Sequence, residues 1–160
     1  MPNRPIRYPE FVRRWWVVAI AAVLISCAPA PSPQAKSAPD VTVEAWYGTA
    51  TSQLAAAARD ADAHFRAGRF DDAAASITKG QPLQARLLEA VRPTLPAMEA
   101  AADLDDVYGR MLLRNGHTGW ARSTFQKNVV RWKTWKPQTP ETERRWKAAV
   151  EAVAECDKQL

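Results

Sequence analysis

The sequence predicts an all-α fold built from antiparallel helical hairpins. From about residue 50 onward the chain is rich in Ala, Leu, Arg and Glu, and its apolar residues recur at the spacing of one helix face. No segment shows a convincing strand alternation, since the one β-branched run, Val41 to Val43, is too short to pair alone. Glycines and prolines divide the helical segments, and loops of about two to four residues force neighbouring helices to be antiparallel.

The first helix is predicted over about residues 51–67, with a stop at Gly68, because glycine readily adopts the left-handed conformation common after a helix. The next helix begins near Phe70, with acids in its first turn that suit the helix dipole, and should break at Gly80–Pro82. A separate short helix then spans about residues 82–91. In chain order, the predicted apolar face of the first helix is Leu54, Ala57, Ala58, Ala61 and Phe65, that of the second is Ala73, Ala74 and Ile77, and that of the short helix is Leu83, Leu87, Leu88 and Val91.

The second half of the chain predicts three longer helices. One spans about residues 96–114 and stops at Gly116, and the next spans about residues 118–135. The last begins after Thr139, a capping residue, with Pro140 at its first position and acids in its first turn. Their predicted apolar faces are Ala101, Leu104, Tyr108, Met111 and Leu112; Ala121, Phe125, Val129 and Trp132; and Trp146, Ala149, Val150, Val153 and Cys156.

The N-terminal segment combines a basic flank, an apolar core and a cysteine, in that order. Residues 1–14 carry four Arg against one Glu, and an apolar run from Trp15 to Ile25 follows. At about 1.5 Å per residue this run covers only about half of a hydrocarbon core about 30 Å thick, so it suits a signal peptide better than a membrane span. The sequence Leu24-Ile25-Ser26-Cys27 then resembles the lipobox of bacterial lipoproteins.

This resemblance implies cleavage between Ser26 and Cys27 and a diacylglycerol thioether on Cys27. The alternative is a short anchor helix with an unmodified cysteine. Two or more acyl chains hold a protein firmly on a membrane, so we expect a lipid-anchored protein of the cell envelope that faces the periplasm. The residue after the cysteine is Ala28 rather than Asp, which favours the outer over the inner membrane.

Three segments follow from these patterns: a signal peptide over 1–26, a lipidated cysteine and Pro/Ala/Ser-rich tether over 27–48, and a helical domain over 49–160. The whole chain carries a net charge of +5, but the leader holds four Arg and one Glu. Cleavage would therefore leave a net charge of only +2. Most of the basicity that suggests nucleic-acid binding thus belongs to the export signal.

The two hairpins resemble each other at the residue level. Phe65, Gly68, Ala73 and Ile77 align with Leu113, Gly116, Ala121 and Phe125, and in this register Ala61 matches Gly109. The pattern resembles the tetratricopeptide repeat, in which small residues let two helices cross closely and glycine makes the turn. The resemblance covers residues 51–135, with copies offset by 48 residues instead of 34; the alternative is an unrelated helical bundle. It implies that the last helix caps the stack.

The sequence carries no pattern that indicates an enzyme, a cofactor or a metal. His64 and His117 are its two histidines, and no acidic residue stands at a spacing that would orient either one. Cys156 lies on an apolar stripe and is expected to be a buried, inert thiol. The acid pairs at 71–72 and 105–106 are expected to be solvated.

Residues 110–140 contain no acidic side chain, whereas residues 59–106 are acidic on balance. Three interpretations of this basic, Trp-rich segment remain open. Its tryptophans pack the helices within a solvated rim of charge, or the segment binds an acidic protein segment in a concave groove, or it contacts anionic lipid or a cell-wall polymer. The candidate partner-binding residues are Arg110, Arg114, Arg122, Lys127, Arg131, Lys133 and Trp135.

These observations favour a membrane-anchored, non-enzymatic adaptor or assembly factor that binds a protein partner of the cell envelope. The alternative classes are a structural envelope protein that binds lipid or polymer, and an enzyme that uses His64, His117 or Cys156. Nucleic acid is not an expected partner, because a lipidated, exported protein does not meet it routinely.

Overall fold

The computed structural model describes residues 40–160, and within them it is all-α, as predicted. A short 3-10 helix η2 (Val41–Val43) precedes five α-helices: α1 (Ala45–Arg66), α2 (Phe70–Leu88), α3 (Leu95–Arg114), α4 (Thr118–Thr134) and α5 (Pro140–Asp157). The residues expected to form the signal peptide, Ser26, Cys27 and most of the tether lie outside the described residues.

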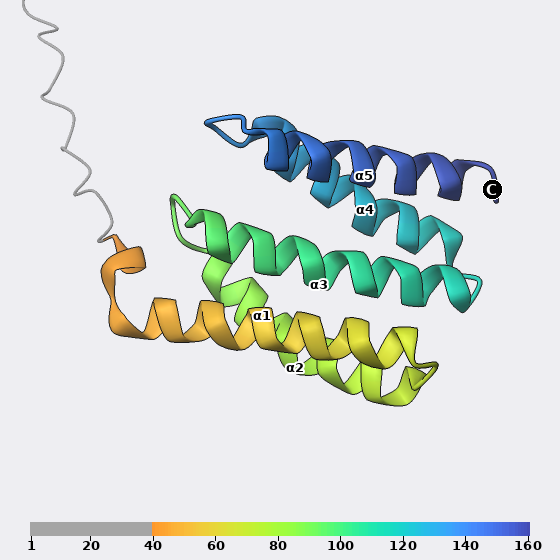
Figure 1. The fold of residues 1–160 in the computed structure, drawn as a ribbon, viewed down its shortest axis with the longest axis horizontal. Helices are drawn as coiled ribbons and strands as arrows, with labels where there is room; N and C mark the ends of the chain where they lie inside the picture. The colour runs from red at the N-terminus through yellow and green to blue at the C-terminus, as the bar shows by residue number, and fades with distance from the viewer. Residues whose placement is uncertain (1–39) are drawn as a thin grey trace, which may run out of the picture. The chain divides into compact units, whose positions relative to one another are not determined.

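The helices form antiparallel hairpins that stack side by side. Figure 1 shows α1 with α2, then α3, and then α4 with α5 in three successive tiers. The apolar core follows the same order: one cluster joins α1, α2 and α3, and a second joins α4, α5 and the end of α3. The predicted capping role of α5 is confirmed, because its inner side buries Ala149 and Cys156 while Glu143, Lys147 and Glu151 face solvent.

The turns after α1 and α3 are built alike. Gly68 and Gly116 have φ angles of +72° and +76°, in the left-handed region that only glycine enters without strain. In each turn the glycine N–H donates to the carbonyl three residues back, at 3.0 Å in both cases, and the next residue donates five residues back at 2.9 Å. This is the Schellman arrangement, so both glycines end their helices as the sequence predicts.

The first helix starts six residues earlier than predicted, at Ala45, so the folded part reaches into the segment assigned to the tether. Tyr47 lies in the added turns and is fully buried. Its hydroxyl donates to the carbonyl of Leu87 at 3.3 Å and accepts the N–H of Thr94 at 3.3 Å. Burial of this ring against the α2–α3 connection accounts for the extension of the helix.

The predicted break at Gly80 and Pro82 is wrong, because α2 continues through both residues to Leu88. A proline inside a helix costs about 3 kcal/mol, but the segments on both sides of it are held by packing. Ile77 and Leu87 are buried in the same core cluster. The helix that was expected over 82–91 is therefore the second half of α2, and Val91, expected to be buried, is exposed in the loop.

Candidate functional site

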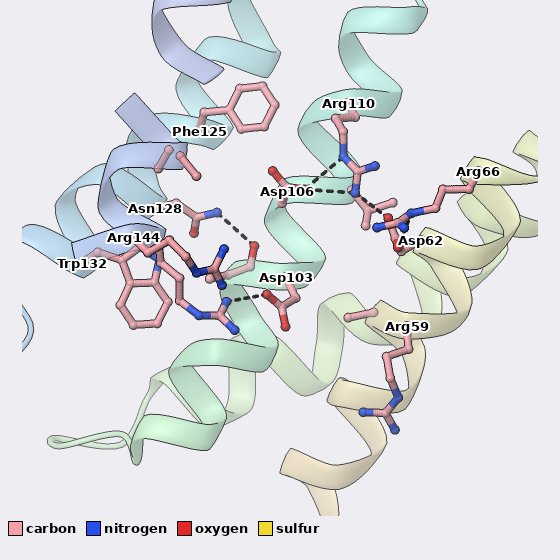
Figure 2. A pocket seen from close by; sticks show the side chains of 16 residues that line it. Arg59, Asp62, Arg66, Asp103, Asp106, Arg110, Phe125, Asn128, Trp132 and Arg144 are labelled. Atoms are coloured by element: carbon pink, nitrogen blue, oxygen red, sulfur yellow. Dashed lines mark hydrogen bonds and ion pairs between the residues drawn. The ribbon is translucent and has the colours of Figure 1, made fainter. Parts of the chain in front are cut away.

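A groove of about 390 Å³ lies between α1, α3 and α5, and side chains of α4 also line it. Figure 2 shows α1 on one side, α3 as the floor, and α4 and α5 on the other side. Small side chains, Ala58, Ala102 and Ala149, bring the helix backbones close to the groove surface. Arginines, aspartates and Asn128 line most of the rest, together with the apolar side chains of Val107, Phe125 and Trp132. The site is therefore a charged channel whose base is formed by small and apolar side chains.

Asp62 of α1 joins the first two tiers on one side of the groove. Its carboxylate pairs with Arg110 of α3 at 2.7 Å and with Arg66 of its own helix at 2.8 Å. Burial raises the pKa of Asp62, but the hydrogen bonds and charges of Arg110 and Arg66 outweigh it and hold the pKa below its usual value. For Asp106, which also pairs with Arg110, burial dominates and the pKa is raised.

Arg145 of α5 makes the equivalent connection on the other side. Its guanidinium contacts Asp103 of α3 at 2.6 Å and Glu141 of α5 at 2.8 Å. Burial lowers the pKa of Arg145, but these carboxylates outweigh it and raise the pKa. Glu141 also accepts from Arg144, and this hydrogen bond is the main reason that its pKa falls to about 2.

Three arginines keep their charged ends open to solvent at the rim of the groove. Arg59 is exposed and has no ion-pair partner among residues 40–160, and Arg66 and Arg144 are largely exposed although each has a carboxylate neighbour. Arg59 and Arg66 stand on α1, whereas Arg144 stands on α5. A guanidinium with free N–H groups binds a carboxylate in a two-pronged geometry, so these three side chains can bind acidic groups from both sides of the channel.

The seven candidate partner-binding residues do not gather on one surface. Among the arginines, Arg110 lines the groove, Arg114 lies 3.5 Å from the centroid of the Phe70 ring, and Arg122 pairs with Asp157. Arg131 is buried in a 2.9 Å pair with Asp105, with both side chains less than a tenth exposed.

Of the remaining three candidates, Lys127 and Lys133 are exposed on α4 and Trp135 is half-buried at its end. The acid pair expected to be solvated at 105–106 is thus buried at its first member, Asp105, because Arg131 neutralises it. The charges that are segregated along the chain are largely paired across the helices.

Four arginines of the groove, namely Arg59, Arg66, Arg144 and Arg145, were not among the candidates. The internal repeat carries a signal that points to this part of the surface. The 48-residue offset that aligns Ala61 with Gly109 also aligns Asp62 with Arg110, and these two side chains are in contact. Equivalent positions of adjacent hairpins therefore face the same channel.

The other candidate residues lie away from the groove. His64 accepts a hydrogen bond from Arg69 at 3.1 Å, and Asp72 lies 3.9 Å from the same ring nitrogen, beyond hydrogen-bond distance. His117 is exposed at the start of α4. Cys156 is fully buried, as predicted, and burial raises the pKa of its thiol.

Within residues 40–160, no group of three or more His, Cys, Asp or Glu side chains is arranged to hold a metal ion. In the same range, no helix has the length and apolar character needed to cross a bilayer. The chain matches no protein-family model, no curated protein sequence and no solved structure. The groove and its charges are therefore the basis for a functional proposal.

Proposed function

We propose that this protein is a membrane-anchored, non-enzymatic adaptor of the cell envelope that binds an acidic segment of a partner protein in the α1–α3–α5 groove. The observation that carries the proposal is the pairing of a base of small and apolar side chains with rim arginines on opposite sides of one channel. Small floor residues admit a polypeptide close to the helices, and the arginines supply charge-assisted hydrogen bonds to its carboxylates.

The stacked fold supports this function in a second way. The groove is formed by four separate helices, so its shape depends on how the hairpins are stacked. The Asp62–Arg110 and Asp103–Arg145 pairs fix that stacking, since each joins two of the helices that line the channel. The binding surface is thus largely preformed, which limits the ordering entropy that binding must overcome.

Binding to the groove is tested with labelled synthetic peptides, one rich in Glu and one rich in Lys but otherwise matched. Fluorescence anisotropy with the full chain is expected to show salt-sensitive binding of the Glu-rich peptide only. The double substitution Arg59→Glu and Arg144→Glu should abolish it, because it reverses the charge on both rims. Lys79→Glu, an exposed change on α2, is the matched control and should leave binding intact. Equal binding of both peptides, or an unaffected double variant, would remove the support for the proposal.

The partner itself is sought by photocrosslinking in native membranes. A crosslinker in place of Ala148, an exposed residue of the groove, is expected to capture a specific envelope protein. The same crosslinker at Lys79 should not capture that protein, and the arginine double variant should lose it.

The anchor part of the proposal rests on the resemblance of Leu24–Cys27 to a lipobox. Cys27→Ala is expected to leave the leader uncleaved or to release the protein from the membrane. Intact-mass measurement and membrane fractionation distinguish these results from the wild type. An unchanged mass and an unchanged distribution would contradict lipidation, whereas the groove experiment would stand independently.

A further inference from the structure

Helix α4 presents two opposite sides with different chemistry. Phe125, Asn128 and Trp132 point toward the groove, whereas Val130 lines a separate shallow hollow. Each residue advances about 100° around a helix, so Asn128 and Val130 lie about 200° apart. Whatever contacts the outer side of α4 therefore leaves the groove accessible.

The outer side of α4 exposes two large apolar side chains among polar ones. We define the α4 outer face by Trp120, Ser123, Lys127, Val130 and Lys133, which fall within an arc of about 140°. Trp120 is 74% exposed and Val130 is 60% exposed, the two highest values for large apolar side chains within the five α-helices. The face continues into a hollow of about 530 Å³ that is lined chiefly by apolar atoms, with Leu88, Pro93 and Met98 on its other side.

The charge on this face has one sign. Lys127 and Lys133 are exposed and have no ion-pair partner among the described residues, and residues 110–140 include no acid. The arginines of α4 are different, since Arg122 and Arg131 each pair with an aspartate. Two free lysines beside an exposed tryptophan and valine form a surface that is complementary to anionic headgroups over an apolar layer, the environment in which Trp and Lys are favoured.

We propose that the α4 outer face lies against an anionic bilayer surface and orients the domain so that its groove faces away from the lipid. The length of chain before the described residues fits this arrangement. Twelve residues separate Cys27 from Asp40, and they span at most about 43 Å. An anchor at Cys27 would thus keep the domain within reach of the membrane, and the α4 outer face would select one orientation there.

Lipid photocrosslinking of the full chain on vesicles tests this orientation. Benzoylphenylalanine replaces Val130 in one variant and Trp120 in another, and the vesicles contain phosphatidylethanolamine with or without phosphatidylglycerol. Both variants are expected to give lipid adducts, read by mass, that require phosphatidylglycerol. The yield should fall when NaCl rises from about 0.1 M to about 1 M, where the Debye length shrinks from about 10 Å to about 3 Å.

Two matched sets of variants separate this orientation from mere proximity. The same crosslinker at Val150, exposed on α5, should give few adducts. Lys127→Gln and Lys133→Gln should each lower the yield at position 130 about fivefold, the equivalent of about 1 kcal/mol per lysine at an anionic surface. Lys79→Gln, on α2, should not lower the yield.

The possible failures are distinct. Equal yields at 130 and 150, insensitivity to phosphatidylglycerol, or adducts with polypeptide instead of lipid would each overturn the proposal. Flotation of the chain with the vesicles that lack phosphatidylglycerol reports the anchor by itself, because the α4 outer face is expected to bind only the anionic ones. Arg59→Glu with Arg144→Glu should leave the lipid adducts unchanged, so a failure of the groove would not be mistaken for a failure of this face.

Discussion

Gly109 of α3 packs directly against the Phe125 ring of α4, and replacing it with alanine should destabilise the protein. A Cβ atom at this position would lie 2.5 Å from both Cε1 and Cζ of Phe125, whereas carbon atoms in ordinary contact are about 3.5–4.0 Å apart. The Phe125 ring is 2% exposed and packs in the core cluster with Ala121 and Cys156, so a shift of the ring disturbs that packing. Relief of the overlap therefore requires that the two helices separate or that the ring leaves its rotamer.

The magnitude follows from two opposing effects. Alanine in place of glycine inside a helix gains about 1 kcal/mol of helix propensity, while overpacking of a core by an overlap of this size loses about 3 kcal/mol. We expect Gly109→Ala to lower the free energy of unfolding by about 2 kcal/mol. For a folded part of this size, that difference lowers the melting temperature by about 8 °C.

Two other glycines provide internal controls for the same substitution. A Cβ on Gly48 of α1 meets nothing within 4 Å, so Gly48→Ala should raise the free energy of unfolding by about 0.5 kcal/mol. A Cβ on Gly80 meets the end of the Leu104 side chain at 2.9 Å, which can shift, so Gly80→Ala should lie between the other two.

Thermal and urea unfolding followed by far-ultraviolet circular dichroism measures all three variants. The double variant Gly109→Ala with Phe125→Leu should lose at least about 1 kcal/mol less free energy of unfolding than the two single variants lose in sum, because the two sites are in contact. A Gly109→Ala protein as stable as the wild type, or a coupling near zero, would refute the close crossing of α3 and α4.

Three further outcomes are expected. Asp105→Asn should lower the free energy of unfolding, measured in urea, by about 3 kcal/mol, because it leaves Arg131 charged and buried without its partner. Replacing the pair together, with Asp105→Leu and Arg131→Met, should recover most of that loss. Gly116→Ala should lower the free energy of unfolding by about 1–2 kcal/mol in the same assay, since the φ of +76° at this position strains any residue with a Cβ atom. The stabilisation that Glu141 gains from Arg144 is present above pH about 4.5 and is lost as the pH falls toward the folded pKa of about 2. Glu141→Gln should therefore flatten the loss of melting temperature across that window, and an identical acid profile for both proteins would contradict the ion pair.

Local signals in the sequence predicted most of the helical fold. Thr139 forms the capping box with Thr142 at the start of α5, and Gly68 and Gly116 end α1 and α3, because each feature depends only on neighbouring residues. The prediction failed at Pro82, where the packing of Ile77 and Leu87 overrides a local helix breaker. No local signal shows that distant parts of the chain will hold α2 together.

The candidate site was less predictable for the same reason. Arg131 and Lys127 look equivalent in the sequence, yet one is buried against Asp105 and the other is exposed. Which basic side chains remain free depends on the pairing of helices that are far apart along the chain. The groove arginines on α1 belong to a stretch that is acidic on balance, so composition alone does not mark them as a basic binding surface.

The division of the core into two clusters has a consequence for the dynamics of the domain. One cluster involves α1, α2 and α3, and the other holds α4 and α5 against the last turn of α3. In a stack whose elements contact only their neighbours, such parts open with different free energies, so the α4–α5 hairpin is the natural unit of partial unfolding. The groove needs both parts in place, because α1 carries one rim and α5 the other. A ligand in the channel would hold the two units together, and amide hydrogen exchange in α4 and α5 should slow when it binds.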